Sequence, residues 1–453
     1  MTDVTVIGGG LAGSEAAWQL AERGHSVRLV EMRPNRSTPA HHTAAFAELV
    51  CSNTFRSDAF DHPVGILKEE MRRLGSLIIA MGERHRIPGG TALTLDRGEF
   101  SADVTRALER HPRIEVVREE AAGIPEGPAI IATGPLTSPA LHDAILAFSG
   151  QDEMAYWDAA SPIVTEESVD WSQVYFASRY GKGEPDAFAN CPLNEEEYKA
   201  LWQALRSAEG HERESFEDER YFEACLPVEV LAQRGEDTLR FGPMRPVGLR
   251  DPRTGRPPYA VLQLRRENAA GSLWNLVGCQ TGLRFHEQER VFRLIPALRE
   301  AEFERFGVIH RNTFLKSPSV LLPTLQARTR PDVFFAGQII GSEGYVEAAA
   351  GGLVAAINLG RLLQGEEPLV WPATTAIGGL LRYVSASDPA SFQPMHVAFG
   401  LMDPLPDPPR RKERRKAELA ERALREFEVF AGQHGLALRP RAARPADAKE
   451  EAR

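Results

Sequence analysis

The sequence has few cysteines, no long apolar run and no metal-like spacing of ligands. Its four cysteines stand far apart without a CxxC pair, which excludes a disulfide scaffold and favours a reducing compartment; they are Cys51, Cys191, Cys225 and Cys279. No run of about eighteen apolar residues indicates a membrane span, and the strand-like segment 4–7 follows the start without a charged leader. No histidine or cysteine cluster has the spacing of metal ligands. We therefore expect a cytoplasmic protein with no bound metal and no membrane partner.

The chain also lacks an excess of positive charge, since its formal net charge is −10. A negative total usually argues against nucleic acid as a partner. Binding depends on local patches, however, so the distribution of arginine and lysine along the chain decides the question. The length of 453 residues exceeds what one hydrophobic core usually organises, which predicts two domains.

Alternating strand-like and helix-like segments predict an α/β fold. Residues 4–7, 11–23 and 26–31 have the patterns of strand, helix and strand, which is the beginning of a Rossmann-type domain. Short strands and proline-rich turns then interrupt this pattern. We predict three parts: a discontinuous dinucleotide-binding domain of residues 1–150 and 308–408, an inserted α+β domain of residues 151–307, and a basic helix with a disordered charged tail over 409–453.

Helical periodicity predicts further helices over residues 63–80, 100–110, 194–208 and 348–363. In the last part of the chain, apolar residues recur at three- and four-residue spacing. They are Ala420, Ala423, Leu424, Phe427 and Phe430. This spacing predicts that one face of a terminal helix docks on the body of the protein.

A glycine fingerprint lies between the first strand and the first helix. Six consecutive residues match G-x-G-x-x-G, namely Gly8, Gly9, Gly10, Leu11, Ala12 and Gly13. Gly8 permits the tight turn, Gly10 lets the backbone approach a pyrophosphate, and Gly13 lets helix pack on strand. Glu31 ends the next strand, where an acid can hold the adenosine ribose hydroxyls. Strand, helix and acid together make the match specific for a dinucleotide.

Two further segments favour FAD over NAD as that dinucleotide. Residues 130–134, ending in Thr133 and Gly134, resemble the ATG strand end of glutathione-reductase-like flavoproteins. Residues 334–338 resemble their C-terminal strand and turn, with Gly337 in place and Gln338 where an aspartate is usual. The following block would point a helix N-terminus at the flavin ring; it contains Gly341, Glu343 and Gly344. No second G-x-G-x-x-G is present, so we expect NAD(P)H to bind without a Rossmann domain of its own.

Longer blocks carry a closer resemblance, which extends from residue 3 to about residue 400. They include TPAHHT at 38–43, FAELVCSN at 46–53, LKEEMR at 67–72, ATGPLTS at 132–138, ASRYGK at 177–182, YFEACLPVE at 221–229, FGPMRPVGL at 241–249 and GSEGYVEAA at 341–349. In these blocks the chain resembles the folate- and FAD-dependent bacterial tRNA (uracil-5-)-methyltransferases, the TrmFO family. It departs from the family pattern at Gly282, where a histidine is usual.

The resemblance implies a reaction and its participants. A one-carbon unit passes from 5,10-methylenetetrahydrofolate to C5 of the T-loop uridine of tRNA and is reduced to methyl by FAD, which NAD(P)H restores. Uracil C5 becomes nucleophilic only after a group adds to C6, and a thiolate suits this role. The resemblance assigns that attack to Cys225 and a supporting role near the flavin to Cys51, as a base or as partner of the methylene. Cys191 and Cys279 are expected to be inert.

Two stretches could supply a basic surface for tRNA despite the acidic total. Seven arginines stand between residues 240 and 267, with Phe241 and Tyr259 available for stacking on bases: Arg240, Arg245, Arg250, Arg253, Arg256, Arg265 and Arg266. The second stretch is the basic run 410–416, which is more simply explained as a solvated helix face.

Two rival functions remain open from the residues. One is the related flavoprotein that modifies the wobble uridine of tRNA, which carries an extra C-terminal helical domain where this chain ends soon after its flavin segment. The other is a redox-inert FAD-bound scaffold, which would share the glycine fingerprint but would need no working cysteine.

Overall fold

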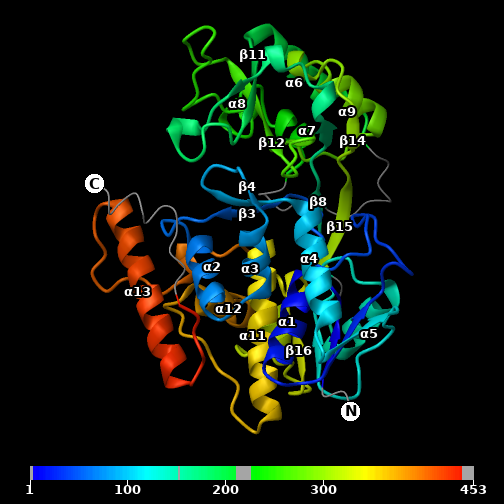
Figure 1. Cartoon of the computed structure of the whole chain (residues 1–453), viewed down its shortest axis with the longest axis vertical. Helices are drawn as coiled ribbons and strands as arrows, with labels where there is room; N and C mark the ends of the chain where they lie inside the picture. Colours follow the sequence, from blue (N-terminus) through cyan, green and yellow to red (C-terminus); the bar gives the residue numbers. More distant parts are fainter. Residues whose placement is uncertain (1–3, 152–153, 211–225, 441–453) are drawn as a thin grey trace.

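The computed structural model describes residues 4–151, 154–210 and 226–440. Figure 1 shows two lobes, with the N-terminal sheet and α11 in the lower lobe and the green segments of the middle of the chain in the upper lobe. Strands β8 (Met154–Ala159) and β15 (Ile309–Phe314) pair antiparallel where the chain passes from one lobe to the other and back. The upper lobe is therefore an insertion into the lower one.

A parallel sheet forms the centre of the lower lobe, in the strand order β16-β7-β1-β2-β6. Its strands are β1 (Val4–Ile7), β2 (Val27–Glu31), β6 (Ile114–Arg118), β7 (Ala129–Ile131) and β16 (Val333–Phe335). The apolar runs of β1, β7 and β16 are almost wholly buried, as expected for parallel strands covered on both faces. The carboxyl ends of β1 and β2 carry the glycine fingerprint and Glu31, so the fold brings both to one edge.

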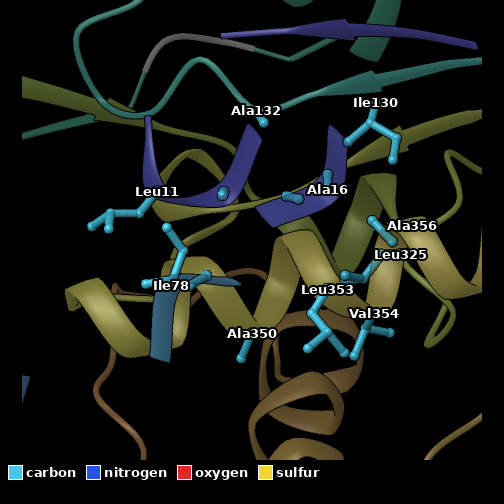
Figure 2. Close-up of a cluster of buried hydrophobic side chains, with 14 of the residues drawn as sticks. Leu11, Ala16, Ile78, Ile130, Ala132, Leu325, Ala350, Leu353, Val354 and Ala356 are labelled. Atoms are coloured by element: carbon cyan, nitrogen blue, oxygen red, sulfur yellow. The ribbon is translucent and has the colours of Figure 1, made fainter. Parts of the chain in front are cut away.

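Two helices cross closely beneath this edge, α1 (Leu11–Glu22) and α11 (Tyr345–Leu363). Small residues permit the approach: a Cβ built on Gly352 would lie 2.0 Å from the carbonyl oxygen of Ala12. Figure 2 shows the apolar packing around them, with Ala16 of α1 and Ala350, Leu353 and Val354 of α11. Helix α11 is long and apolar enough to cross a membrane by composition, but 83% of that window is buried inside the protein.

The helix expected over residues 63–80 is interrupted. The structure has α2 (Pro63–Arg73) and α3 (Leu77–Arg84) instead. Gly75 between them has a φ of +78°, which a continuous helix does not permit, and Ser76 caps α3 by accepting a hydrogen bond from the amide of Ile79. The apolar periodicity continues across the break, which is why the sequence pattern does not reveal it.

The remaining helices of the lower lobe surround this core. They are α4 (Arg97–Arg110), α5 (Pro139–Ser149), α10 (Ser317–Val320), α12 (Ala376–Ala386) and α13 (Lys412–Gln433). Helix α13, at the left edge of Figure 1, buries the apolar face expected from its spacing, and Phe427 and Phe430 both pack on Trp371. A small sheet in the order β3-β5-β4 lies at the boundary between the lobes; its strands are β3 (Thr54–Ser57), β4 (Arg86–Ile87) and β5 (Ala92–Leu95).

The upper lobe has its own core around an antiparallel sheet in the order β10-β11-β12-β13-β9-β14. The strands are β9 (Ile163–Thr165), β10 (Tyr175–Phe176), β11 (Ala189–Leu193), β12 (Ala260–Arg266), β13 (Leu273–Leu276) and β14 (Phe303–Arg305). The helices are α6 (Glu195–Ser207), α7 (Val228–Gln233), α8 (Thr238–Phe241) and α9 (Phe285–Phe292). Asn194 is the N-cap of α6, in a capping box completed by Glu197, so the helix begins close to its expected start.

Candidate active site at the lobe boundary

The glycine fingerprint adopts the geometry of a phosphate-binding turn. Gly8 has a φ of +102°, and a Cβ built on Gly13 would lie 1.7 Å from the carbonyl oxygen of Gly8, so each must be glycine. At Gly10, by contrast, a Cβ would meet no atom within 4 Å. Open space at the N-terminus of α1 is what a pyrophosphate requires. Leu11 and Ala12 are buried and begin the helix.

Glu31 lies beside this turn at the end of β2. Its carboxylate accepts hydrogen bonds from the amide of Gly9 at 2.7 Å and from Nε of Arg33 at 2.9 Å. Burial would raise the pKa of Glu31, but the hydrogen bonds and charge of Arg33, with the Gly9 amide, outweigh burial and lower it. A cavity of about 50 Å³ adjoins Glu31 and is also lined by Thr133, Glu119 and Glu120. An acid with a lowered pKa at this cavity suits ribose hydroxyls, which donate hydrogen bonds to a carboxylate.

The second flavin-type segment meets the first at the same edge of the sheet. Gly337 has a φ of +85°, and a Cβ there would lie 2.8 Å from the Cβ of Ala12. Gln338 donates a hydrogen bond to Glu343 at 2.6 Å, so the glutamine that replaces the usual aspartate ties its own turn together. Gly134, Gly341 and Gly344 also have positive φ angles. These residues fit FAD: Gly10 leaves open space at the N-terminus of α1, and the turn at Gly337 packs beside Ala12 of that helix and leads on to the N-terminus of α11.

Cys51 lies at that N-terminus. Its Sγ is 3.1 Å from the hydroxyl oxygen of Tyr345, the first residue of α11. The same oxygen accepts hydrogen bonds from the backbone amides of Cys51 at 2.9 Å and Ser52 at 3.1 Å. Burial, and next the nearby Cys51, raise the pKa of Tyr345 well above its usual value, so the phenol keeps its proton. Because two amides occupy the oxygen's acceptor positions, that proton can be donated to the sulfur.

Three arginines hold the loop of Cys51 from across the lobe boundary and from α4. Arg265 of β12 donates to the side chains of Asn53 and Ser52, each at 3.0 Å. Arg305 donates to the carbonyl of Val50 at 2.8 Å, and Arg97 to the carbonyl of Leu49 at 2.7 Å. Burial lowers the pKa of Arg265, while Glu267 and Cys51 are among the groups that oppose this shift. Such cations favour the thiolate form of a cysteine.

The other cysteines differ from Cys51 in placement. Cys225, expected to attack uracil, lies outside the described residues. Cys191 and Cys279 are fully buried in the core of the upper lobe; burial raises the pKa of Cys191 to about 12 and that of Cys279 further still. Both are free thiols there. Within the described part of the chain, no group of three or more His, Cys, Asp or Glu residues could hold a metal ion.

The expected basic surface needs correction in three places. Arg265 is buried against the Cys51 loop and does not face solvent. Arg253 is paired with Asp251, and Arg240 lies over the ring of Tyr259, which removes that tyrosine as an open stacking surface. The arginines of this stretch therefore fall into two groups, those bound to other side chains of the protein and those exposed to solvent. Arg245, Arg250 and Arg256 are the exposed ones without an ion pair in the described residues.

Sequence reasoning overlooked Tyr345, Arg97 and Arg305 altogether. Tyr345 directly follows the expected glycine block, so its position at the N-terminus of the next helix can be predicted from the sequence. The arginines gave no signal, because their partners lie far away in the chain.

The comparisons with known proteins agree with this geometry. A family model described as glucose inhibited division protein A (GIDA) matches residues 3–367. A protein of Moorella thermoacetica named methylenetetrahydrofolate–tRNA-(uracil-5-)-methyltransferase TrmFO is 58% identical over 93% of this chain and 96% of its own length. Proteins with the same name from Symbiobacterium thermophilum and Listeria welshimeri are 57% and 53% identical, each over 95% of this chain and over 97% and 99% of their own lengths. The chain belongs to the TrmFO family.

Solved structures support the fold of this family member. The structure of Aquifex aeolicus GidA in two crystal forms has a TM-score of 0.64 with 16% identity, and the match covers 96% of this chain and 75% or 77% of the GidA chain. This likeness confirms the expected α/β fold with a Rossmann-type FAD-binding domain.

Proposed function

We propose that this chain methylates C5 of the T-loop uridine of tRNA in the cytoplasm. The one-carbon donor is 5,10-methylenetetrahydrofolate, and the reductant is bound FAD that NAD(P)H reduces. The relatives' names support the transfer from folate to a tRNA uracil. The observation that carries the proposal is the position of Cys51, whose thiol lies 3.1 Å from the hydroxyl of Tyr345 at the N-terminus of α11, the helix that follows the second flavin-type segment.

The proposed chemistry begins with the thiolate of Cys225. It adds to uracil C6, forming an S–C6 bond and giving C5 the electron pair that attacks the one-carbon unit. Cys51 then removes the C5 proton as the carbon–nitrogen bond to tetrahydrofolate breaks, so that tetrahydrofolate leaves with that electron pair and a methylene group remains on C5. Reduced FAD, when bound, would supply the hydride that turns this methylene into methyl. The S–C6 bond breaks last, which restores the C5–C6 double bond and releases the thiolate of Cys225.

The chain's own residues prepare Cys51 for this task. The Tyr345 hydroxyl and the nearby charges of Arg97 and Arg265 favour the thiolate, which is the form that can accept a proton. Arg305 holds the loop through its bond to the carbonyl of Val50. Because Arg265 and Arg305 come from the upper lobe, the proton acceptor is in position only when the lobes are together. The proposal therefore places catalysis at the boundary and not inside either lobe.

The test is nucleoside analysis after incubation with unmodified tRNA, methylenetetrahydrofolate and NAD(P)H. We expect 5-methyluridine in the T-loop, and none when folate is omitted. Modification at the wobble position, or none by an FAD-loaded protein, would contradict the proposal. A 5-fluorouridine tRNA separates the two cysteines: Cys51→Ala should still form the covalent adduct and Cys225→Ala should not. The reverse result would exchange their roles.

A further inference from the structure

An exposed tyrosine on the upper lobe is held in an unusual backbone conformation. Tyr180, in the short turn Arg179–Gly181, has φ 58° and ψ 19°, and 63% of it is exposed. A bulky residue seldom adopts this left-handed conformation, which is strained when the surroundings impose it. An exposed aromatic side chain gains little from burial to offset that cost, so the strain needs another explanation.

The surroundings do impose the conformation. The amide of Tyr180 donates to the carbonyl of Gly248 at 2.9 Å, and Arg179 donates to the carbonyls of Arg245 and Val247. These bonds join the tyrosine turn to the loop 245–250. The tyrosine is therefore fixed on this loop before any partner arrives.

Gly248 lies directly against the tyrosine ring. It has a φ of +85°, and a Cβ built there would lie 2.9 to 3.0 Å from Cζ, Cε1 and Cε2 of Tyr180. Only glycine lets the loop approach the ring so closely. Backbone covers one side of the ring, and most of the residue still faces solvent.

The loop 245–250, whose Gly248 packs against the ring, also carries two arginines. Arg245 and Arg250 are exposed, and the described residues provide no ion pair for either. Arg245 is close enough to contribute, after burial, to lowering the pKa of Arg179. Unneutralised arginines beside an open aromatic face are the combination with which proteins bind unpaired bases and their phosphates. A protein partner would favour an apolar surround with fewer unpaired cations.

We propose that Tyr180 is a stacking platform for an unpaired nucleobase of the substrate RNA, with Arg245 and Arg250 holding the adjacent phosphates. This inference rests on the proposed function, and it names the surface on which that RNA is held. The strained turn keeps the ring ready, so the RNA need not order it.

Phe176 provides a matched comparison four residues earlier. It is 46% exposed, but its ring is stacked on Trp171 at 5.8 Å with an interplanar angle of 11°. The Trp274 ring also lies 6.1 Å from it, so two aromatic side chains pack against Phe176, whereas in the described part of the chain the ring of Tyr180 meets only the backbone of Gly248 on one side. Exposure alone therefore does not distinguish the two residues, whereas their aromatic neighbours do.

The experiment is equilibrium binding of unmodified tRNA to the FAD-loaded protein at several salt concentrations, without folate or NAD(P)H. Tyr180→Ala should weaken binding about 5- to 150-fold with the salt dependence unchanged, because stacking is lost and no phosphate contact is. Tyr180→Trp should retain the affinity. Arg250→Glu should weaken binding and flatten the salt dependence. Phe176→Ala should bind as the wild type does.

A second variant is the control for an effect on folding. Tyr180→Gly removes the ring and also the left-handed strain, so its thermal stability should equal or exceed that of the wild type while RNA binding weakens as in Tyr180→Ala. Wild-type affinity in both variants would overturn the stacking platform alone. Loss of self-association in Tyr180→Ala with unchanged RNA affinity would identify a protein interface and also overturn it. A wild type that binds no tRNA would overturn the proposed function itself.

Discussion

The cysteine of the Cys51 loop and the two cysteines in the core of the upper lobe lie in opposite kinds of surroundings. Cys51 is half-buried among a phenol hydroxyl, backbone amides and three arginines, whereas Cys191 and Cys279 are sealed among apolar side chains. Burial without a partner disfavours the thiolate, as the raised pKa of Cys191 shows, and a polar cationic surround favours it. If Cys51 acts as proposed, its reactivity depends on the arginines that the upper lobe contributes to its loop, and the following variants test this dependence.

The largest expected effect comes from a variant that loses FAD binding but keeps the folded structure. Gly10→Val should abolish FAD binding and all methylation while leaving thermal unfolding close to that of the FAD-free wild type, since a Cβ at Gly10 meets no atom of the protein and only the stabilisation by bound FAD is lost. Gly13→Ala is the contrasting variant, because its Cβ would lie 1.7 Å from the carbonyl oxygen of Gly8 and should destabilise the fold itself. Flavin absorbance and thermal denaturation measure both. An FAD-loaded Gly10→Val protein would refute the phosphate-binding assignment.

Removing one of the arginines near Cys51 tests the contrast between Cys51 and the two core cysteines. Arg265→Met should slow methylation tenfold or more with FAD content retained, because the Cys51 loop loses its bonds to Asn53 and Ser52 and the thiolate loses a nearby charge. Single-turnover rates at saturating tRNA measure the effect. Arg290→Met is the control, since Arg290 pairs with Glu287 on the surface of α9. Equal rates in Arg265→Met and the wild type would show that the upper lobe does not activate Cys51.

A smaller effect concerns Glu70, a carboxyl group that is buried as the core cysteines are. Burial raises the pKa of Glu70 to about 8, although it accepts hydrogen bonds from the amides of Ala376 and Ile377. The folded state therefore favours the protonated acid. Its contribution to stability is present below the ordinary pKa of 4.5 and is lost as pH rises to about 8.

Denaturant titrations from pH 5 to pH 8 measure this loss, which linkage limits to about 1.4 kcal/mol per pH unit. Glu70→Gln, which mimics the neutral acid, should flatten the pH dependence across this range. An equally steep dependence in the variant would assign the titration to other groups.

Features set by residues close together in the chain are predicted from the sequence, whereas features set by contacts between distant residues are not. The glycine fingerprint and Glu31 are local, so their geometry follows from a short pattern. The break at Gly75 was not predicted, because one residue in a left-handed conformation does not disturb the apolar periodicity around it. The role of Arg265 was predicted wrongly, because its partner Asn53 is 212 residues away and an arginine-rich stretch indicates solvent more often than a buried clamp.

One panel of variants tests the account most directly: 5-methyluridine formation in T-loop position by Cys51→Ala, Cys191→Ala and Cys279→Ala, each loaded with FAD. The account predicts that Cys51→Ala falls about 10²- to 10⁴-fold, the range for a lost acid–base group, while the two core variants keep wild-type rates per FAD bound. A Cys51→Ala protein with wild-type activity, or a core variant that binds FAD normally and is inactive, would contradict it.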